Sequence, residues 1–250
     1  MSRRGSQRGT IRAVILRALF KAPRVSVLLP VWNGEAFLEP AIESMLRQTL
    51  SSFELIVIDD GSTDASAAMA GKFACGDDRV RVMRRAHEGL SAALNAGIAA
   101  ARGEYIARMD ADDINVPDRL QKQVAYLDAH PACVAVGAWI DVVDEAGLPL
   151  GVKTFSERHE QISAALLLGI SPIAHPTVVM RRDVLRAAGG LNSRSTKSSA
   201  TRTPWTLKVV RNLRRFTYPE SPAARISRST RLRPSRSPSS CRSRKIRRAP

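Results

Sequence analysis

Short apolar segments alternate with longer amphipathic ones from Val25 to about Leu168, and this alternation leaves few folds open to the chain. The strand-like segments are residues 25–29, 53–58, 79–83, 104–109 and 133–140. Apolar side chains recur at helical spacing over residues 37–46, 65–73, 90–101, 120–127 and 157–168. Strands joined by helices through short loops form βαβ units. The sequence therefore predicts an α/β, Rossmann-like fold, with a mainly parallel central sheet flanked by helices.

Polar segments follow three of these strands, at residues 30–35, 59–64 and 110–113. In parallel sheets, ligands bind beyond the carboxyl ends of the strands. The last segment contains Asp110, Asp112 and Asp113, whose carboxylates repel one another unless a hard cation lies between them. A bound cation would in turn suit a phosphate-bearing substrate. The alternative is a solvated acidic turn ahead of a helix that starts near Pro117.

The positive charge of the chain is confined to its ends. Residues 1–193 contain 22 basic and 22 acidic residues, whereas residues 194–250 contain 17 basic residues and one acid, Glu220. The net charge of +16 therefore belongs to the C-terminal tail. Residues 25–193 alone carry a net charge of −7. This net negative charge argues against specific nucleic-acid binding by residues 25–193, because nucleic-acid-binding proteins need a basic surface that contacts the phosphates.

Three regions follow from this composition. Residues 1–24 are a basic leader, in which residues 9–21 are compatible with an amphipathic helix on an anionic membrane surface or with a disordered segment. Residues 25–192 form the folded domain. Residues 193–250 are rich in Arg, Ser and Pro, so we expect a disordered basic tail. The three cysteines lack disulfide or zinc spacing, which favours the cytoplasm, with peripheral contact at the inner membrane face as an option.

Several ordered blocks of the chain resemble family 2 glycosyltransferases. The blocks are Val25–Gly34, Gln48-Thr49 followed by Phe53–Asp64, Gly89–Ile98, Ala101–Asp113, Pro117–Leu120 and His175-Pro176-Thr177. The resemblance covers roughly residues 25–192. It implies a GT-A fold that binds a nucleotide-sugar, with a uridine diphosphate sugar as the expected donor and a glycan or a lipid-linked molecule as the acceptor. It also implies a DxD motif that holds Mg²⁺ or Mn²⁺.

The resemblance assigns roles to individual residues. Asp112 would be the principal metal ligand, supported by Asp110 and Asp113. His175 would lie near the rim of the active site. The expected donor-binding residues are Pro30, Val31, Asn33, Glu35, Asp59, Asp60, Asp110 and Asp112. Without the resemblance, the segment around Asp60 could be only a strand-to-helix turn.

The chain departs from the family pattern on the acceptor side. The family takes its catalytic base from an acidic motif shortly after the segment that resembles Gly189-Gly190, yet no Asp or Glu occurs between Asp183 and Glu220. We therefore expect a family 2 glycosyltransferase that is truncated or frameshifted after about residue 192. Its function would be inverting sugar transfer in cell-surface polysaccharide or glycan assembly, impaired because the base is not identifiable. The alternative is a non-catalytic protein that binds polyanions through its basic tail.

Overall fold

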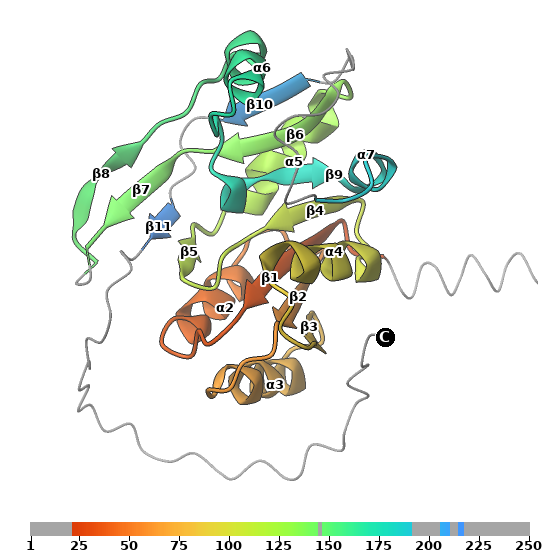
Figure 1. Cartoon of the computed structure of the whole chain (residues 1–250), viewed down its shortest axis with the longest axis vertical. Coiled ribbons are helices and arrows are strands. Elements are labelled where there is room, and N and C mark those ends of the chain that lie inside the picture. Colours follow the sequence, from red (N-terminus) through yellow and green to blue (C-terminus); the bar gives the residue numbers. More distant parts are fainter. Residues whose placement is uncertain (1–21, 145–146, 192–205, 211–214, 218–250) are drawn as a thin grey trace, which may run out of the picture.

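A computed structural model describes residues 22–144, 147–191, 206–210 and 215–217 of the chain. Its main element is a seven-stranded sheet in the order β10-β6-β9-β4-β1-β2-β3 (Figure 1). Within it, β1, β2, β3 and β4 run parallel to their neighbours in that group, and β10 runs parallel to β6, whereas β9 is antiparallel to both β4 and β6. The strands are β1 (Val25–Val31), β2 (Phe53–Asp59), β3 (Val80–Arg84), β4 (Tyr105–Arg108), β6 (Cys133–Ala138), β9 (Val179–Arg181) and β10 (Thr206–Val210). The expected mainly parallel sheet is confirmed.

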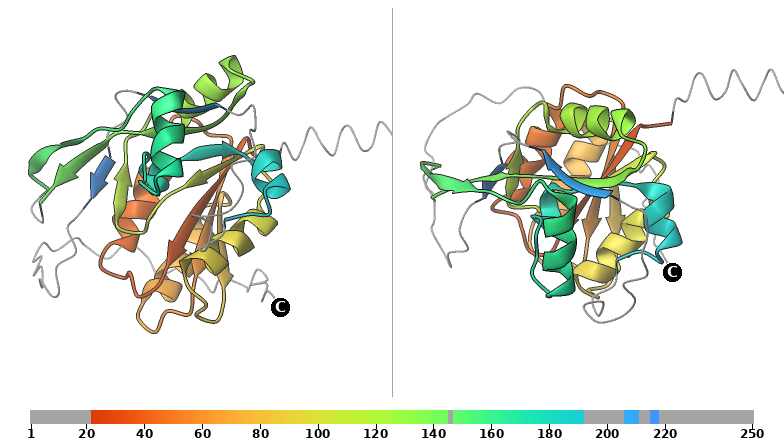
Figure 2. Two further views of the ribbon diagram at one scale, coloured as in Figure 1. Left: turned by 45° about the horizontal axis from the view of Figure 1, so that its top comes forward. Right: turned by 90° about the horizontal axis from the view of Figure 1, so that it is seen from above.

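Helices cover both faces of this sheet (Figure 2). Side chains alternate along β1, so that Val27 and Leu29 pack on one face with residues of α2, α3 and α5, while Leu28 packs on the other with α4 and α7. Pro40 lies in the first turn of α2, where its missing N–H costs no hydrogen bond. The helices are α2 (Leu38–Leu46), α3 (Ser66–Gly76), α4 (Leu90–Ala100), α5 (Arg119–Ala129), α6 (His159–Leu167) and α7 (Arg182–Ala187), with a 3₁₀ turn η1 (His175–Thr177).

A second, four-stranded sheet has the order β5-β11-β7-β8. Its strands are β5 (Asp113–Asn115), β11 (Arg215–Thr217), β7 (Ile140–Val143) and β8 (Pro149–Lys153). The single strand expected over residues 133–140 is therefore wrong in extent, because the chain leaves the main sheet at Trp139 and continues as β7. Strands β5 and β9 are only three residues long, too short for an alternating pattern to be read from them.

Two short strands lie within residues 193–250, which we expected to be a disordered basic tail. Residues 206–210 form β10 on the edge of the main sheet, and residues 215–217 form β11. Thr206-Leu207-Lys208-Val209-Val210 is rich in β-branched residues, a local preference that the polar average of the tail hides. The rest of the tail and the amphipathic leader, residues 9–21, lie outside the described residues. In the described part of the chain, no helix is long and apolar enough to cross a membrane.

Candidate active site

The three polar segments that follow β1, β2 and β4 meet at one edge of the main sheet. β1 lies between β2 and β4, with Val31 opposite Asp59 and Leu28 opposite Arg108. The three strands are parallel, so their carboxyl ends point the same way. The structure thus brings residues 30–35, 59–64 and 110–113 together, as the sequence predicted. Pro30 and Val31 are buried within β1 itself.

The first two segments are bound to each other through side chains. The Asn33 side-chain oxygen accepts a hydrogen bond from the Thr63 backbone N–H at 2.8 Å, and the Glu35 carboxylate accepts one from Ala65 at 2.8 Å. In return, the backbone N–H of Glu35 donates to Asp64 at 3.0 Å. Asn33 and Glu35 therefore hold the two loops in a fixed relation. Their direct contact with a donor stays a prediction.

Asp60 is buried and joins the end of β2 to the loop before α4. Its carboxylate accepts hydrogen bonds from the backbone N–H groups of Gly89, at 2.8 Å, and Glu88, at 3.2 Å. The ring nitrogen Nδ1 of His87 lies 3.0 Å from the same carboxylate. A Cβ atom at Gly61 would come within 2.9 Å of the His87 backbone nitrogen, so this approach requires glycine. Asp60 consequently positions His87 at the edge of the site.

Trp32 and His87 form an aromatic stack that the sequence interpretation missed. Their rings are 4.5 Å apart between centroids and inclined by 21°. Trp32 keeps 55% of its surface exposed although it lies directly after buried β1 residues. The only signal in the sequence was an aromatic residue directly after a predicted strand, which does not indicate its partner. The stack presents a flat surface beside the acidic segments.

Asp59 is also buried, and its contacts are internal. One carboxylate oxygen accepts the backbone N–H of Ser62 at 3.0 Å, and the other lies 3.3 Å from Nε of Arg84 on β3. These contacts shape the turn that presents Asp60. Asp59 is thus placed as a support of the loop, and its expected contact with the donor stays a prediction.

Asp110, Asp112 and Asp113 form a compact carboxylate cluster. One oxygen from each carboxylate lies within 4.8 Å of the others. Asp113 is buried at the start of β5, and one of its oxygens accepts the backbone N–H of Asp110 at 3.3 Å. Carboxylate oxygens are the donors that hard divalent cations prefer. The donor set therefore fits Mg²⁺ or Mn²⁺, although exposed acidic groups also cluster without a metal.

Arg108 is a second residue that the sequence interpretation missed. Its side chain is 5% exposed, and two of its nitrogens contact the Asp110 carboxylate at 2.6 and 3.1 Å. Burial lowers the pKa of Arg108, and the charges of Asp110 and Asp112 oppose that shift. Such a bidentate pair fixes the orientation of the carboxylate. Arg108 therefore sets how Asp110 enters the cluster.

His175 stands on the turn η1, which is anchored beneath the same edge. The hydroxyl of Thr177 accepts the Ala138 backbone N–H at 2.9 Å, and the Gln123 amide donates to the Thr177 carbonyl at 2.8 Å. The pKa of His175 is lowered to about 4, first by loss of hydration and then by the positive charge of Arg108. The residue nevertheless keeps contact with solvent, so the ring is neutral and accessible at neutral pH.

A mainly parallel sheet flanked by helices, with a carboxylate cluster at the carboxyl ends of its strands, is the arrangement of α/β proteins that bind their ligands at that edge. Comparison with protein families makes the assignment specific. Residues 26–189 match the model of Glycosyl transferase family 2, and the chain belongs to that family. The segment Asp110-Ala111-Asp112 has the spacing of a DxD motif, and both aspartates belong to the carboxylate cluster.

Similar proteins include bacterial glycosyltransferases. The chain is 36% identical over 173 residues to the putative glycosyltransferase EpsE of Bacillus subtilis. The aligned region covers 68% of this chain and 61% of EpsE. The chain is also 35% identical over 167 residues to the amylovoran biosynthesis glycosyltransferase AmsE of Erwinia amylovora. That alignment covers 66% of this chain and 62% of AmsE. The chain thus spans less than two thirds of the length of these relatives.

Solved structures share the GT-A fold. The structure of S. aureus TarS 1–349 in complex with UDP-GlcNAc superposes with a TM-score of 0.60 at 19% identity, over 80% of this chain and 60% of that one. The mannosyltransferase PcManGT from Pyrobaculum calidifontis, in complex with GDP-Man and Mn²⁺, gives a TM-score of 0.57 at 19% identity, over 78% and 56%. At this identity, the likeness concerns the fold.

Proposed function

We propose that this chain binds a nucleotide-diphospho-sugar at the carboxyl edge of β1, β2 and β4, as the donor-binding part of an inverting glycosyltransferase for cell-surface polysaccharide assembly. The observation that carries the proposal is the meeting of three polar strand ends around the carboxylate cluster of Asp110, Asp112 and Asp113. The relatives EpsE and AmsE support the glycosyltransferase class, and the name of AmsE points to polysaccharide synthesis. A uridine diphosphate sugar is the donor we expect.

In this proposal Asp112, with Asp110 and Asp113, would hold Mg²⁺ or Mn²⁺. A bound divalent cation stabilises the negative charge that develops on the leaving diphosphate. Arg108 keeps the Asp110 carboxylate in one orientation, so the cluster is preorganised. The flat stack of Trp32 on His87, fixed by Asp60, offers a surface for the planar base of the nucleotide.

The first test is a calorimetric titration of UDP-GlcNAc into the full chain, with and without Mn²⁺. We expect binding that depends on Mn²⁺ and that weakens at least about tenfold in Asp112→Asn, because the variant loses an anionic ligand. Glu43→Gln is the matched control: Glu43 lies on α2, pairs with Arg47 and is half exposed. It should bind like the original chain.

Two results would argue against the proposal. Binding that is independent of Mn²⁺ and unchanged in Asp112→Asn would mean that the cluster is a solvated turn. Salt-sensitive DNA binding that disappears when residues 194–250 are deleted, without nucleotide binding, would favour the alternative of a polyanion-binding protein.

The acceptor side completes the proposal. No acid lies between Asp183 and Glu220, so no base for the acceptor hydroxyl can be identified. His175 was expected at the rim, but its low pKa makes it a weak proton acceptor. We therefore propose that transfer by this chain is impaired while donor binding is retained. A glycan or a lipid-linked acceptor, a cytoplasmic location and contact of residues 9–21 with the inner membrane face belong to the same proposal.

A further inference from the structure

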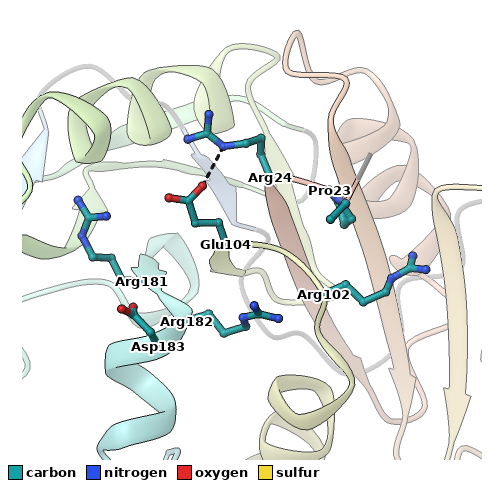
Figure 3. A pocket seen from close by; sticks show the side chains of 8 residues that line it. Pro23, Arg24, Arg102, Glu104, Arg181, Arg182 and Asp183 are labelled. Carbon is teal, nitrogen blue, oxygen red and sulfur yellow. Dashed lines mark ion pairs between the residues drawn. The ribbon is translucent and has the colours of Figure 1, made fainter. Parts of the chain in front are cut away.

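A basic cavity lies on the edge of the main sheet opposite to the carboxylate cluster. Arg24 precedes β1 and Glu104 precedes β4. Arg181 ends the antiparallel β9, where it is opposite Tyr105, and Arg182 begins α7. The cavity has a volume of about 450 Å³, within the range of small-molecule pockets. Its charged lining residues are Arg24, Arg102, Glu104, Arg181, Arg182 and Asp183, four cations and two anions (Figure 3).

Two of the four arginines are already neutralised by carboxylates. Arg24 pairs with Glu104 at 3.2 Å and with Asp128 at 2.7 Å. Arg102 pairs with the buried Glu54 at 2.8 Å, and in Figure 3 its guanidinium extends away from the other charged groups. Among the described residues, these pairs leave Arg181, Arg182 and Asp183 as the lining charges without an ion pair, so 2 − 1 = +1 remains as excess positive charge.

Arg181 and Arg182 contact no carboxylate within the described residues. Arg181 donates to the backbone carbonyls of Cys133, at 3.0 Å, and Leu127, at 2.7 Å, and its guanidinium lies 5.5 Å from the centroid of the Tyr105 ring. Arg182 donates through Nη1 to the carbonyl of Ala101 at 2.8 Å. Among the described residues, its Nε and Nη2 make no hydrogen bond. The Arg181 guanidinium is thus held by carbonyls and by the Tyr105 hydroxyl, whereas Arg182, which lines the cavity, keeps two donor nitrogens without a hydrogen bond in the described part of the chain. The anions Glu104 and Asp183 line the same cavity.

We infer that this cavity is a binding site for a phosphate group, separate from the donor site. The planar fork of a guanidinium matches two phosphate oxygens, and Arg182 keeps such a pair of donors, Nε and Nη2, on one side. Anchoring by backbone carbonyls reduces the entropy lost when the anion binds. The phosphate is carried by a soluble metabolite or by a phospholipid headgroup, which offer the same chemistry.

The test uses the full chain in the Asp112→Asn background without divalent cations, so that the donor site does not contribute. Sodium diphosphate is titrated by calorimetry, and sedimentation is measured with phosphatidylcholine vesicles that contain phosphatidylglycerol. Arg182→Gln should weaken binding about tenfold, the equivalent of one charge-assisted hydrogen bond. Glu104→Gln should strengthen it, because a repelling carboxylate is removed.

Arg186→Gln is the matched control, because Arg186 is exposed, lies on α7 like Arg182 and does not line the cavity. The Arg186→Gln variant keeps the same basic tail, so it should bind diphosphate and vesicles as well as the Asp112→Asn chain does. If Arg182→Gln loses diphosphate binding but still binds vesicles, the ligand is a soluble phosphate. If it loses vesicle binding but still binds diphosphate, the ligand is a phospholipid headgroup. The inference is overturned if Arg182→Gln and Arg186→Gln bind both probes equally, provided that their melting temperatures agree.

Discussion

At the scale of single residues, the ion pair between Arg108 and Asp110 supports the carboxylate cluster. Arg108→Met would leave Asp110 without its bidentate partner, and the carboxylate is 30% exposed on its side chain. Breaking a fully buried pair costs about 3–5 kcal/mol, and the partial exposure reduces this to about 2 kcal/mol of unfolding free energy. Urea denaturation measures the difference. Arg47→Met, which breaks an exposed pair, should cost less than about 0.5 kcal/mol.

His175 makes a prediction about pH. Its pKa falls from 6.5 in the unfolded chain to about 4 in the folded one, because the ring loses hydration and faces Arg108. The unfolded state therefore binds the proton first, and stability is lost as pH falls from about 6.5 towards 4. His175→Asn should show a smaller drop in melting temperature between pH 7 and pH 5. An unchanged drop, equal to that of the control His159→Asn, would show that the ring is fully hydrated.

At the scale of elements, Asn33 joins the loops after β1 and β2. Two variants of Asn33 separate the contributions of backbone strain and of a hydrogen bond to the free energy of unfolding. Asn33 has φ of +50°, a conformation that asparagine tolerates and alanine does not. Asn33→Gly keeps the backbone relaxed and loses the bond to Thr63, whereas Asn33→Ala adds strain. We expect Asn33→Gly to cost about 1 kcal/mol and Asn33→Ala about 1 kcal/mol more, measured by thermal unfolding.

The same pair tests the expected role of Asn33 in donor binding. If Asn33 acts only by holding the loops, Asn33→Gly should weaken UDP-GlcNAc binding no more than Ser62→Ala, since the Ser62 hydroxyl accepts the Asn33 backbone N–H at 3.0 Å. A much larger loss in Asn33→Gly would support direct contact with the donor.

The sequence predicted the elements whose cause is local and missed those whose cause is distant. Val25–Leu29 and Phe53–Ile58 can be recognised because all but one residue in each is apolar, and Asp110–Asp113 by the density of acids at a strand end. Arg108 looked like an ordinary polar residue in a strand, because its burial depends on β9 packing beside β4. The stack of Trp32 on His87 joins positions 55 residues apart, and no local pattern indicates it.

At the scale of the whole molecule, the composition changes where the family pattern stops. The family match ends at residue 189, and the basic, acid-poor tail begins a few residues later. Enrichment in Arg, Ser and Pro with depletion of acids is typical of a shifted reading frame in a GC-rich gene. We predict that one of the other two frames downstream of codon 192 encodes an acidic pair followed by an apolar helical pattern. Translation of both frames checks this, and the absence of the pattern from both would refute it.

Restoring the reading frame should affect acceptor activation and leave donor binding unchanged. A chain rebuilt with the restored frame shares residues 1–192 with this one, so both should bind UDP-GlcNAc and Mn²⁺ with similar affinity. Only the rebuilt chain would supply a base for the acceptor hydroxyl, and its transfer rate should be about 10²–10⁴-fold higher. Replacing the restored acidic pair by amides should return the rate to that of the present chain without changing donor affinity. Equal transfer rates for the two chains would mean that the shared residues 1–192 already contain the base, and His175 would then be the first residue to replace.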